Sequence, residues 1–74
     1  MARTQAYTLK GDTVRRIRVR KHHWRQEDLA EAANVSVTQL SRLESGIHTP
    51  QISTVERLAE ALGVEFDDIV EWHV

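Results

Sequence analysis

The chain contains no cysteine, one proline, three glycines and few aromatic residues in 74 positions. Without cysteine there is no disulfide framework and no thiolate zinc site. Little proline and glycine, with 41% hydrophobic residues, argues against a disordered chain. No apolar run approaches the ~18 residues that a membrane-spanning helix needs, and the first eleven residues lack the apolar segment of a secretory signal. The composition therefore predicts one small cytoplasmic domain.

Net charge is also nearly absent, at −1, whereas a nucleic-acid-binding domain is more often basic. The total conceals an asymmetry. Residues 1–25 contain eight Lys or Arg and one Asp, and residues 26–74 contain two Arg and ten Asp or Glu. This distribution predicts that one side of the molecule faces phosphate groups and the other faces elsewhere.

Apolar residues recur at helical spacing along most of the chain, and no stretch shows a convincing strand pattern. Residues 1–8 are expected to form a flexible basic arm, followed by one domain over residues 9–74. Ser53 with Glu56 has the spacing of a helix start. The sequence predicts an all-α fold, a compact bundle of five short helices at about residues 9 or 12 to 22, 26–33, 36–45, 53–62 and 66–72.

Residues 26–46 are the most informative segment, because they contain two short amphipathic stretches joined by a tight turn. Asn34 lies at that turn, where a left-handed conformation is expected and Asn tolerates it well. Ser36 is a strong N-cap, Gln39 completes a capping box, and Gly46 ends the second stretch. This spacing predicts a helix-turn-helix, whose second helix enters the major groove of DNA.

The outward face of the second helix has the chemistry that base reading requires. With Leu40 and Leu43 turned inward, this face has no carboxylate to repel phosphate groups, and it carries Val37, Thr38, Ser41, Arg42 and Ser45. The guanidinium of Arg42 can bond guanine O6 and N7, for ~1–3 kcal/mol of discrimination. Gln39 can reach adenine, although its capping role competes. The alternative for each of these residues is an ordinary solvated helix face.

These features resemble the phage repressor and Cro family of bacterial DNA-binding regulators. The resemblance covers about residues 9–70, and it rests on Gln26, Leu29–Ala30, Asn34, Val35–Ser36, Leu40, Leu43–Gly46, Pro50 and Leu58–Val64. It implies a lambda-repressor-like fold and a sequence-specific transcriptional regulator that most often represses. Small members of the family include phage repressor domains, restriction–modification controllers and antitoxins.

The resemblance also implies roles for individual residues. Bases are contacted from the positions of Val37, Thr38 and Arg42, and we add Ser41 from the same exposed face and Gln39, which can reach adenine. Phosphate is bound at the position of Gln26 and near the loop 47–49. The phosphate contacts that we expect are Arg25, Gln26, Ser36, Ser45, His48 and Thr49.

An ion pair between Arg18 and Glu44 is implied by the same resemblance. Arg18 also extends the inner stripe of the first helix, so we expect a structural role rather than DNA contact. The chain departs from the family pattern at three places. Asn34 replaces the usual Gly, Arg25 stands where Ser or Thr often caps the helix, and the segment from Arg18 to Gln26 is one residue longer.

The histidines, the C-terminal carboxylates and the serines do not have the spacing of a metal site or a catalytic site. Adjacent His22 and His23 cannot reproduce helical metal-ligand spacing, so we expect solvated or phosphate-proximal histidines there and at His48 and His73. The carboxylates near Asp67 suit a helix N-terminus better than a catalytic site. The serines lack a recognisable base. We therefore expect no enzyme activity, no metal, no cofactor and no small-molecule ligand.

The C-terminal segment admits two interpretations. Its apolar side chains either close the core or form a dimer surface, and they are Phe66, Ile69, Val70, Trp72 and Val74. A two-fold dimer would place two recognition helices ~34 Å apart on a palindromic operator, in the nucleoid. The rival hypothesis is a protein-interaction module, an antitoxin or adaptor, that uses this acidic and apolar face to bind a partner protein.

Overall fold

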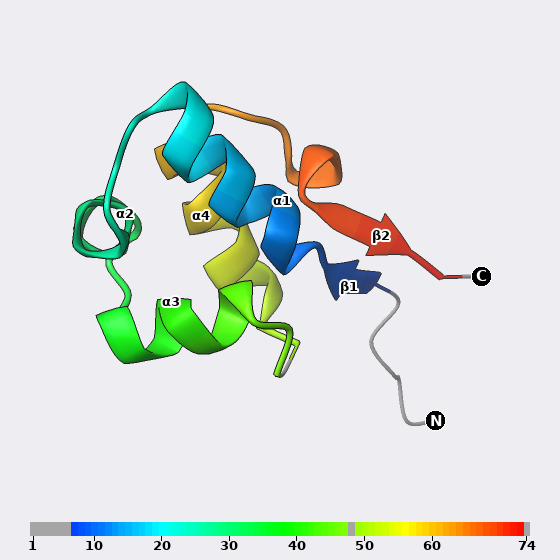
Figure 1. Cartoon of the computed structure of the whole chain (residues 1–74). Coiled ribbons are helices and arrows are strands. Elements are labelled where there is room, and N and C mark those ends of the chain that lie inside the picture. The colour runs from blue at the N-terminus through cyan, green and yellow to red at the C-terminus, as the bar shows by residue number, and fades with distance from the viewer. Residues whose placement is uncertain (1–6, 48, 74) are drawn as a thin grey trace.

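Four α-helices and a small sheet make up the described residues, 7–47 and 49–73 of a computed structural model (Figure 1). This confirms the mostly helical fold that the sequence predicts. None of these helices is long and apolar enough to cross a membrane. In chain order the elements are β1 (Tyr7–Leu9), α1 (Gly11–Arg16), η1 (Ile17–Lys21), α2 (Gln26–Ala33), α3 (Val37–Glu44), α4 (Ile52–Leu62), η2 (Phe66–Asp68) and β2 (Val70–Trp72).

The core is aliphatic and closed to water. Each of the four α-helices contributes, and the largest fully buried side chains are Val14, Leu29, Leu40, Leu43, Val55, Leu58, Leu62 and Ile69. Burial of each such side chain contributes about 1.5–3 kcal/mol relative to leaving it in water. Since α4 packs on α2 and α3 packs on both α1 and α2, the helix-turn-helix rests on a rigid base.

The first helix changes its hydrogen bonding halfway along. It is α-helical from Gly11 to Arg16, and η1 is π-helical, as the bond from the His22 N–H to the Ile17 carbonyl shows. A π-helical turn accommodates one extra residue in an α-helix. It overlaps the segment from Arg18 to Gln26, for which the resemblance predicts one residue more than the family pattern.

The helix-turn-helix has the boundaries that the sequence predicts. The second helix covers Gln26–Ala33, and Asn34 adopts the left-handed conformation with φ 58°. The Ser36 hydroxyl oxygen accepts a 2.9 Å bond from the Gln39 N–H, which confirms the N-cap of α3. Gly46 follows the helix with φ 74°. Local capping thus fixes where α2 ends and α3 begins.

The fourth helix begins earlier than expected. Ser53 is not its N-cap, because Gln51 holds that position and Ile52 is the first helical residue. The Gln51 carbonyl accepts the first bonds, from the N–H groups of Thr54 and Val55. Starting there directs Thr54 and Val55 into the core, and Ser53 stays exposed. The end at Gly63, with φ 76°, agrees with the prediction.

Three predictions for the two ends of the chain are wrong: a fifth helix at 66–72, the absence of strands, and a flexible arm that extends to residue 8. Residues 66–72 form the short 3₁₀ turn η2 and then β2. Tyr7 and Thr8, expected in the flexible arm, form β1 with Leu9 and pair antiparallel with β2. Apolar residues alternate along both strands, and pairing of the strands buries Tyr7, Leu9 and Val70. This burial outweighs the helical spacing of the apolar residues in 66–72. Residues 1–6 of the expected arm lie outside the described residues.

Candidate nucleic-acid interface

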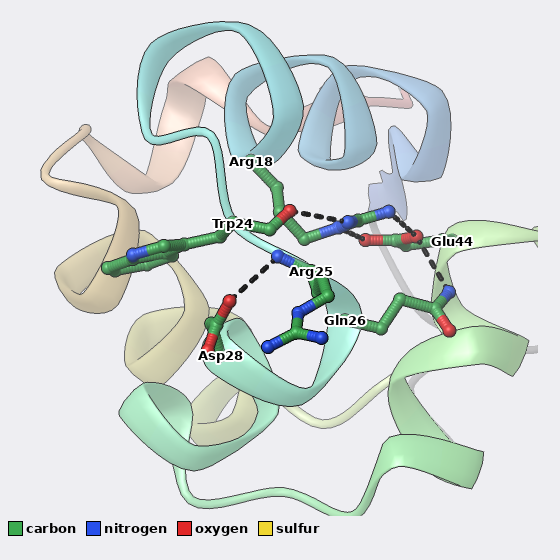
Figure 2. Close-up of polar contacts among 6 residues, drawn as sticks. All are labelled: Arg18, Trp24, Arg25, Gln26, Asp28 and Glu44. Atoms are coloured by element: carbon green, nitrogen blue, oxygen red, sulfur yellow. Dashed lines mark hydrogen bonds and ion pairs between the residues drawn. The ribbon is translucent and has the colours of Figure 1, made fainter.

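A buried ion pair connects the first helix to the end of α3. Arg18 Nε donates to Glu44 Oε2 at 2.7 Å, a second guanidinium nitrogen donates to Glu44 Oε1 at 3.0 Å, and the third donates to the Trp24 carbonyl at 2.9 Å (Figure 2). The two side chains are 8% and 4% exposed. The expected pair is therefore present, and its satisfied charges fix α3 relative to η1.

The N-terminus of α2 lies beside this pair. Gln26 donates one amide hydrogen to Glu44 Oε1 at 3.1 Å, which orients its side chain and leaves a second N–H (Figure 2). Asp28 accepts the Arg25 N–H at 2.8 Å, which is the reverse half of a capping box, and Arg25 provides no side-chain acceptor for the first turn. The Arg25 side chain is exposed. An N-terminus with a free amide donor and a cation next to it suits a phosphate group.

A long-range bond holds the turn between the two helices. Arg57 of α4 donates through Nε to the Ala33 carbonyl at 3.1 Å. The carbonyl is one of those that a helix leaves without a partner at its C-terminus, and a cation is favourable there. The angle between α2 and α3 is therefore supported from behind by α4 as well as by Asn34 itself.

The outward side of α3 is open to solvent. Val37 is 42% exposed, Thr38, Ser41 and Arg42 are exposed, and Gln39 is half-buried. Ser36 and Ser45 are exposed at the two ends of the helix. In Figure 1, α3 lies at the lower edge of the molecule, away from β2 and the acidic C-terminal segment. The candidate base-reading residues thus share one accessible face, and no described part of the chain covers it.

The first strand anchors the end of the loop that follows α3. Buried Tyr7 donates its hydroxyl to the Pro50 carbonyl at 2.8 Å, across most of the chain. Burial raises the pKa of the Tyr7 phenol above its ordinary value. Ile47 is 68% exposed and Thr49 is exposed, whereas His48 lies outside the described residues. Sequence spacing alone does not reveal this anchor, because Tyr7 stands in the segment expected to be a flexible arm.

The C-terminal residues expected at a dimer surface lie partly in the core and partly on the surface. Ile69 and Val70 are buried, at 0% and 2% exposure, so as parts of a dimer surface they are wrong. Phe66 is half-buried and Trp72 is 54% exposed, and Val74 lies outside the described residues. The Tyr7 ring meets both Phe66 and Trp72 edge-on, at centroid distances of 5.7 and 5.8 Å. Burial by this aromatic group explains why the segment folds back as a strand.

The histidines have structural neighbours. The His22 Nε2 lies 2.7 Å from the Leu62 carbonyl oxygen, and its ring stacks on Trp24 at a centroid distance of 4.4 Å. His73 contacts the Thr8 hydroxyl. Among residues 7–47 and 49–73, no three His, Asp or Glu side chains are placed to hold a metal ion. His22 thus joins the first helix to the end of α4.

Comparison with known proteins points to the same segment. The sequence profile described as "Helix-turn-helix" matches residues 14–69. Control protein C.BamHI of Bacillus amyloliquefaciens is 33% identical over 64 residues, which cover 86% of this chain and 79% of that protein. The HTH-type transcriptional regulator DdrOP3 of Deinococcus deserti is 40% identical over 47 residues, 64% of this chain but only 36% of that protein.

A solved structure has the same fold. The crystal structure of the restriction–modification controller protein C.AhdI from Aeromonas hydrophila superimposes with a TM-score of 0.74. The match covers 78% of this chain and 86% of that chain, at 24% sequence identity. The helical arrangement described above is therefore shared with a controller protein whose sequence has diverged widely.

Proposed function

Because the chain belongs to the helix-turn-helix family of the Cro/C1 type, we propose that it is a sequence-specific regulator of transcription that binds double-stranded DNA by inserting α3 into the major groove. The observation that supports this most is the exposed, carboxylate-free face of a rigidly held α3. A face of this kind suits base edges within a groove lined by phosphates. The activity is binding, with no catalytic step.

Base readout is assigned to the middle of α3. Arg42 donates to guanine O6 and N7, and Val37 with the Thr38 methyl contacts a thymine methyl. Gln39 and Ser41 complete the set. Since the Gln39 N–H is engaged with Ser36 while no described residue bonds its amide side chain, that side chain is available for an adenine.

Phosphate contacts flank this face and set the register of α3 along the groove. Gln26 donates its second amide hydrogen at the N-terminus of α2, and Arg25 adds a cation beside it. Ser36 and Ser45 donate from the ends of α3, and His48 and Thr49 extend the contact along the backbone. The anchored loop at Pro50 supports these last contacts.

We further propose that the protein acts as a homodimer on a palindromic operator and represses by occupying a promoter, in the cytoplasm at the nucleoid. The Trp72 edge, 54% exposed beside half-buried Phe66, supplies an apolar surface for association. Two copies related by a two-fold axis read two half-sites ~34 Å apart. The likeness to C.BamHI, a control protein by name, supports such a setting.

The test is selection of bound duplexes from a random library, followed by titration at several salt concentrations. We expect an enriched inverted repeat and a steep loss of affinity with salt, because several phosphate contacts release counterions. Arg25→Ala should weaken binding to all duplexes alike and lower the salt slope by about one. Glu56→Ala, on the exposed side of α4, is the control. No enriched sequence and a flat salt response would overturn the proposal.

One observation favours a second function. The exposed Trp72 has acidic neighbours, and such an edge suits a partner protein in the manner of an antitoxin or adaptor. If purified protein binds no duplex at low salt but forms a stable complex with the product of an adjacent gene, this second function replaces the first.

A further inference from the structure

The last carbonyl of α2 opens the turn that leads into α3, and its partner comes from another helix. Val35 donates its N–H to the Ala30 carbonyl at 2.9 Å and so closes the last turn of α2. The Ala33 carbonyl accepts Arg57 Nε of α4 at 3.1 Å. Since Ala33 is 1% exposed, little water reaches this oxygen, and the guanidinium satisfies it instead.

This bond fixes the peptide unit on which the direction of α3 depends. The Ala33 carbonyl and the Asn34 N–H share one plane, and Asn34 is left-handed, with φ 58° and ψ 48°. A residue other than Gly prefers the right-handed region, so rotation of this plane would relieve Asn34 and redirect the chain that enters α3. Arg57 opposes the rotation, because it would carry the carbonyl away from the guanidinium.

The base-reading end of α3 is the part that such a change would move. The far end of the helix is held by the two bonds between Glu44 and Arg18. The eight residues of α3 extend about 12 Å, so a tilt of about 10° at Glu44 would shift the end at Val37 and Thr38 by about 2 Å. A binding constellation tolerates only about 0.5 Å. N-terminal residues of a recognition helix are those that contact base edges, so the shift would disturb base contacts directly.

We propose that Arg57 is a positioning residue for base reading, which acts through the Ala33 carbonyl and does not itself touch DNA. The inference rests on the proposed function and adds to it a determinant of specificity on α4, which packs against α2. Loss of the bond should lower affinity for the specific duplex. Affinity for other duplexes should change little, because it depends on phosphate contacts that tolerate small shifts of α3.

Two substitutions separate the hydrogen bond from the charge. Arg57→Gln keeps an N–H donor, because the Gln amide nitrogen is as many bonds from Cα as Arg Nε, and it removes the positive charge. Arg57→Met has a side chain of the same length without a donor. Glu60→Met, at an exposed position of the same helix, controls for a new methionine on α4.

The first measurement is the ratio of affinities for the selected duplex and for a scrambled duplex, at several salt concentrations. Arg57→Met should lower this ratio about tenfold, as for loss of one base contact, whereas Arg57→Gln and Glu60→Met should preserve it. A residue that merely stabilises the fold would change the folded fraction, which weakens both affinities alike and leaves the ratio unchanged. An unchanged ratio in Arg57→Met, or an equal loss in Arg57→Gln, would overturn the inference. So would a lower salt slope in Arg57→Gln, because Arg57 would then contact phosphate.

Hydrogen exchange of the free protein is the second measurement, and it requires no DNA. The Val35 N–H, bonded to the Ala30 carbonyl, exchanges when the turn opens. Its exchange should be about tenfold faster in Arg57→Met and unchanged in Arg57→Gln. A wild type that prefers no duplex would overturn the proposed function. A selective wild type whose ratio and exchange do not respond to Arg57→Met would overturn this inference alone.

Discussion

Arg18 and Glu44 illustrate at the scale of single residues how a buried charge is kept. The guanidinium has three hydrogen bonds within 3.0 Å, two to Glu44 and one to the Trp24 carbonyl. The pairing was foreseeable from the sequence, since both positions belong to a recognisable pattern. The Trp24 carbonyl was not, because its position depends on the π-helical turn and the chain reversal that follows it.

Removal of one partner should cost more than the pair itself contributes. Arg18→Met or Glu44→Leu leaves an uncompensated buried charge and should lower the free energy of unfolding by about 3–5 kcal/mol. The double variant removes both charges and should lose clearly less than the sum. Urea unfolding followed by circular dichroism gives all three values. Strictly additive losses would show that the two charges do not interact.

Tyr7 should give the fold a pH dependence in the alkaline range. Its folded-state pKa is raised by burial, so the stability that it contributes is fully present below the unfolded value near 10. That stability is lost as pH rises through the folded pKa, because the phenol must then ionise inside the protein. Tyr7→Phe removes this dependence, together with about 1 kcal/mol from the bond to the Pro50 carbonyl.

The measurement is the free energy of unfolding of both proteins from neutral pH to above pH 10. The wild-type advantage should shrink as pH rises, and the phenolate absorbance of the only tyrosine reports the ionisation. An advantage of constant size across this range would contradict the role given to the Tyr7 hydroxyl.

At the scale of elements, predictions succeeded where the determinants are local. Capping by Ser36, the left-handed Asn34 and the terminal Gly46 define α2 and α3 within a few residues, and the structure has each of them. The two strands near the chain ends were not predicted, because β1 and β2 form only by pairing with each other. Three alternating residues in each strand, far apart in the sequence, give little signal until they pair.

The two candidate caps should differ in their effect on helix stability. Ser36→Ala removes the acceptor for the Gln39 N–H and should lower the free energy of unfolding by about 1 kcal/mol. Ser53→Ala should be neutral or slightly stabilising, because Ser53 lies inside α4 and Ala is the better helix former. Thermal unfolding of both variants distinguishes them. Equal losses would mean that Ser53 caps α4 after all.

The contact between α1 and α3 depends on Gly11. A Cβ at this position would lie 2.4 Å from the Leu43 carbonyl oxygen and 2.6 Å from that of Glu44. In a solvated helix the change from Gly to Ala stabilises, but here it should destabilise by about 1–3 kcal/mol because backbone must move. Chemical unfolding of Gly11→Ala shows the sign. A stabilised variant would mean that the two helices are less closely packed than described.

For the whole molecule, the distribution of charge matters more than its sum. Eight of the ten Lys and Arg precede residue 26 and ten of the eleven Asp and Glu follow it, so a net charge of −1 is compatible with phosphate binding beside Arg25. The outward face of α3 was largely predictable, because helical spacing determines which of its side chains point away from the core. The Trp72 edge was not, since the exposure of Trp72 and the burial of Val70 depend on the strand pairing.

The central claim is that α3 reads bases through its exposed face, and Arg42 tests it most directly. Duplexes selected by the wild type and by Arg42→Ala should be compared, with affinities measured for each at fixed salt. We expect Arg42→Ala to lose about 1–3 kcal/mol on the wild-type sequence and to accept any base at one position, formerly guanine. Unchanged affinity and an unchanged selected sequence would contradict the claim.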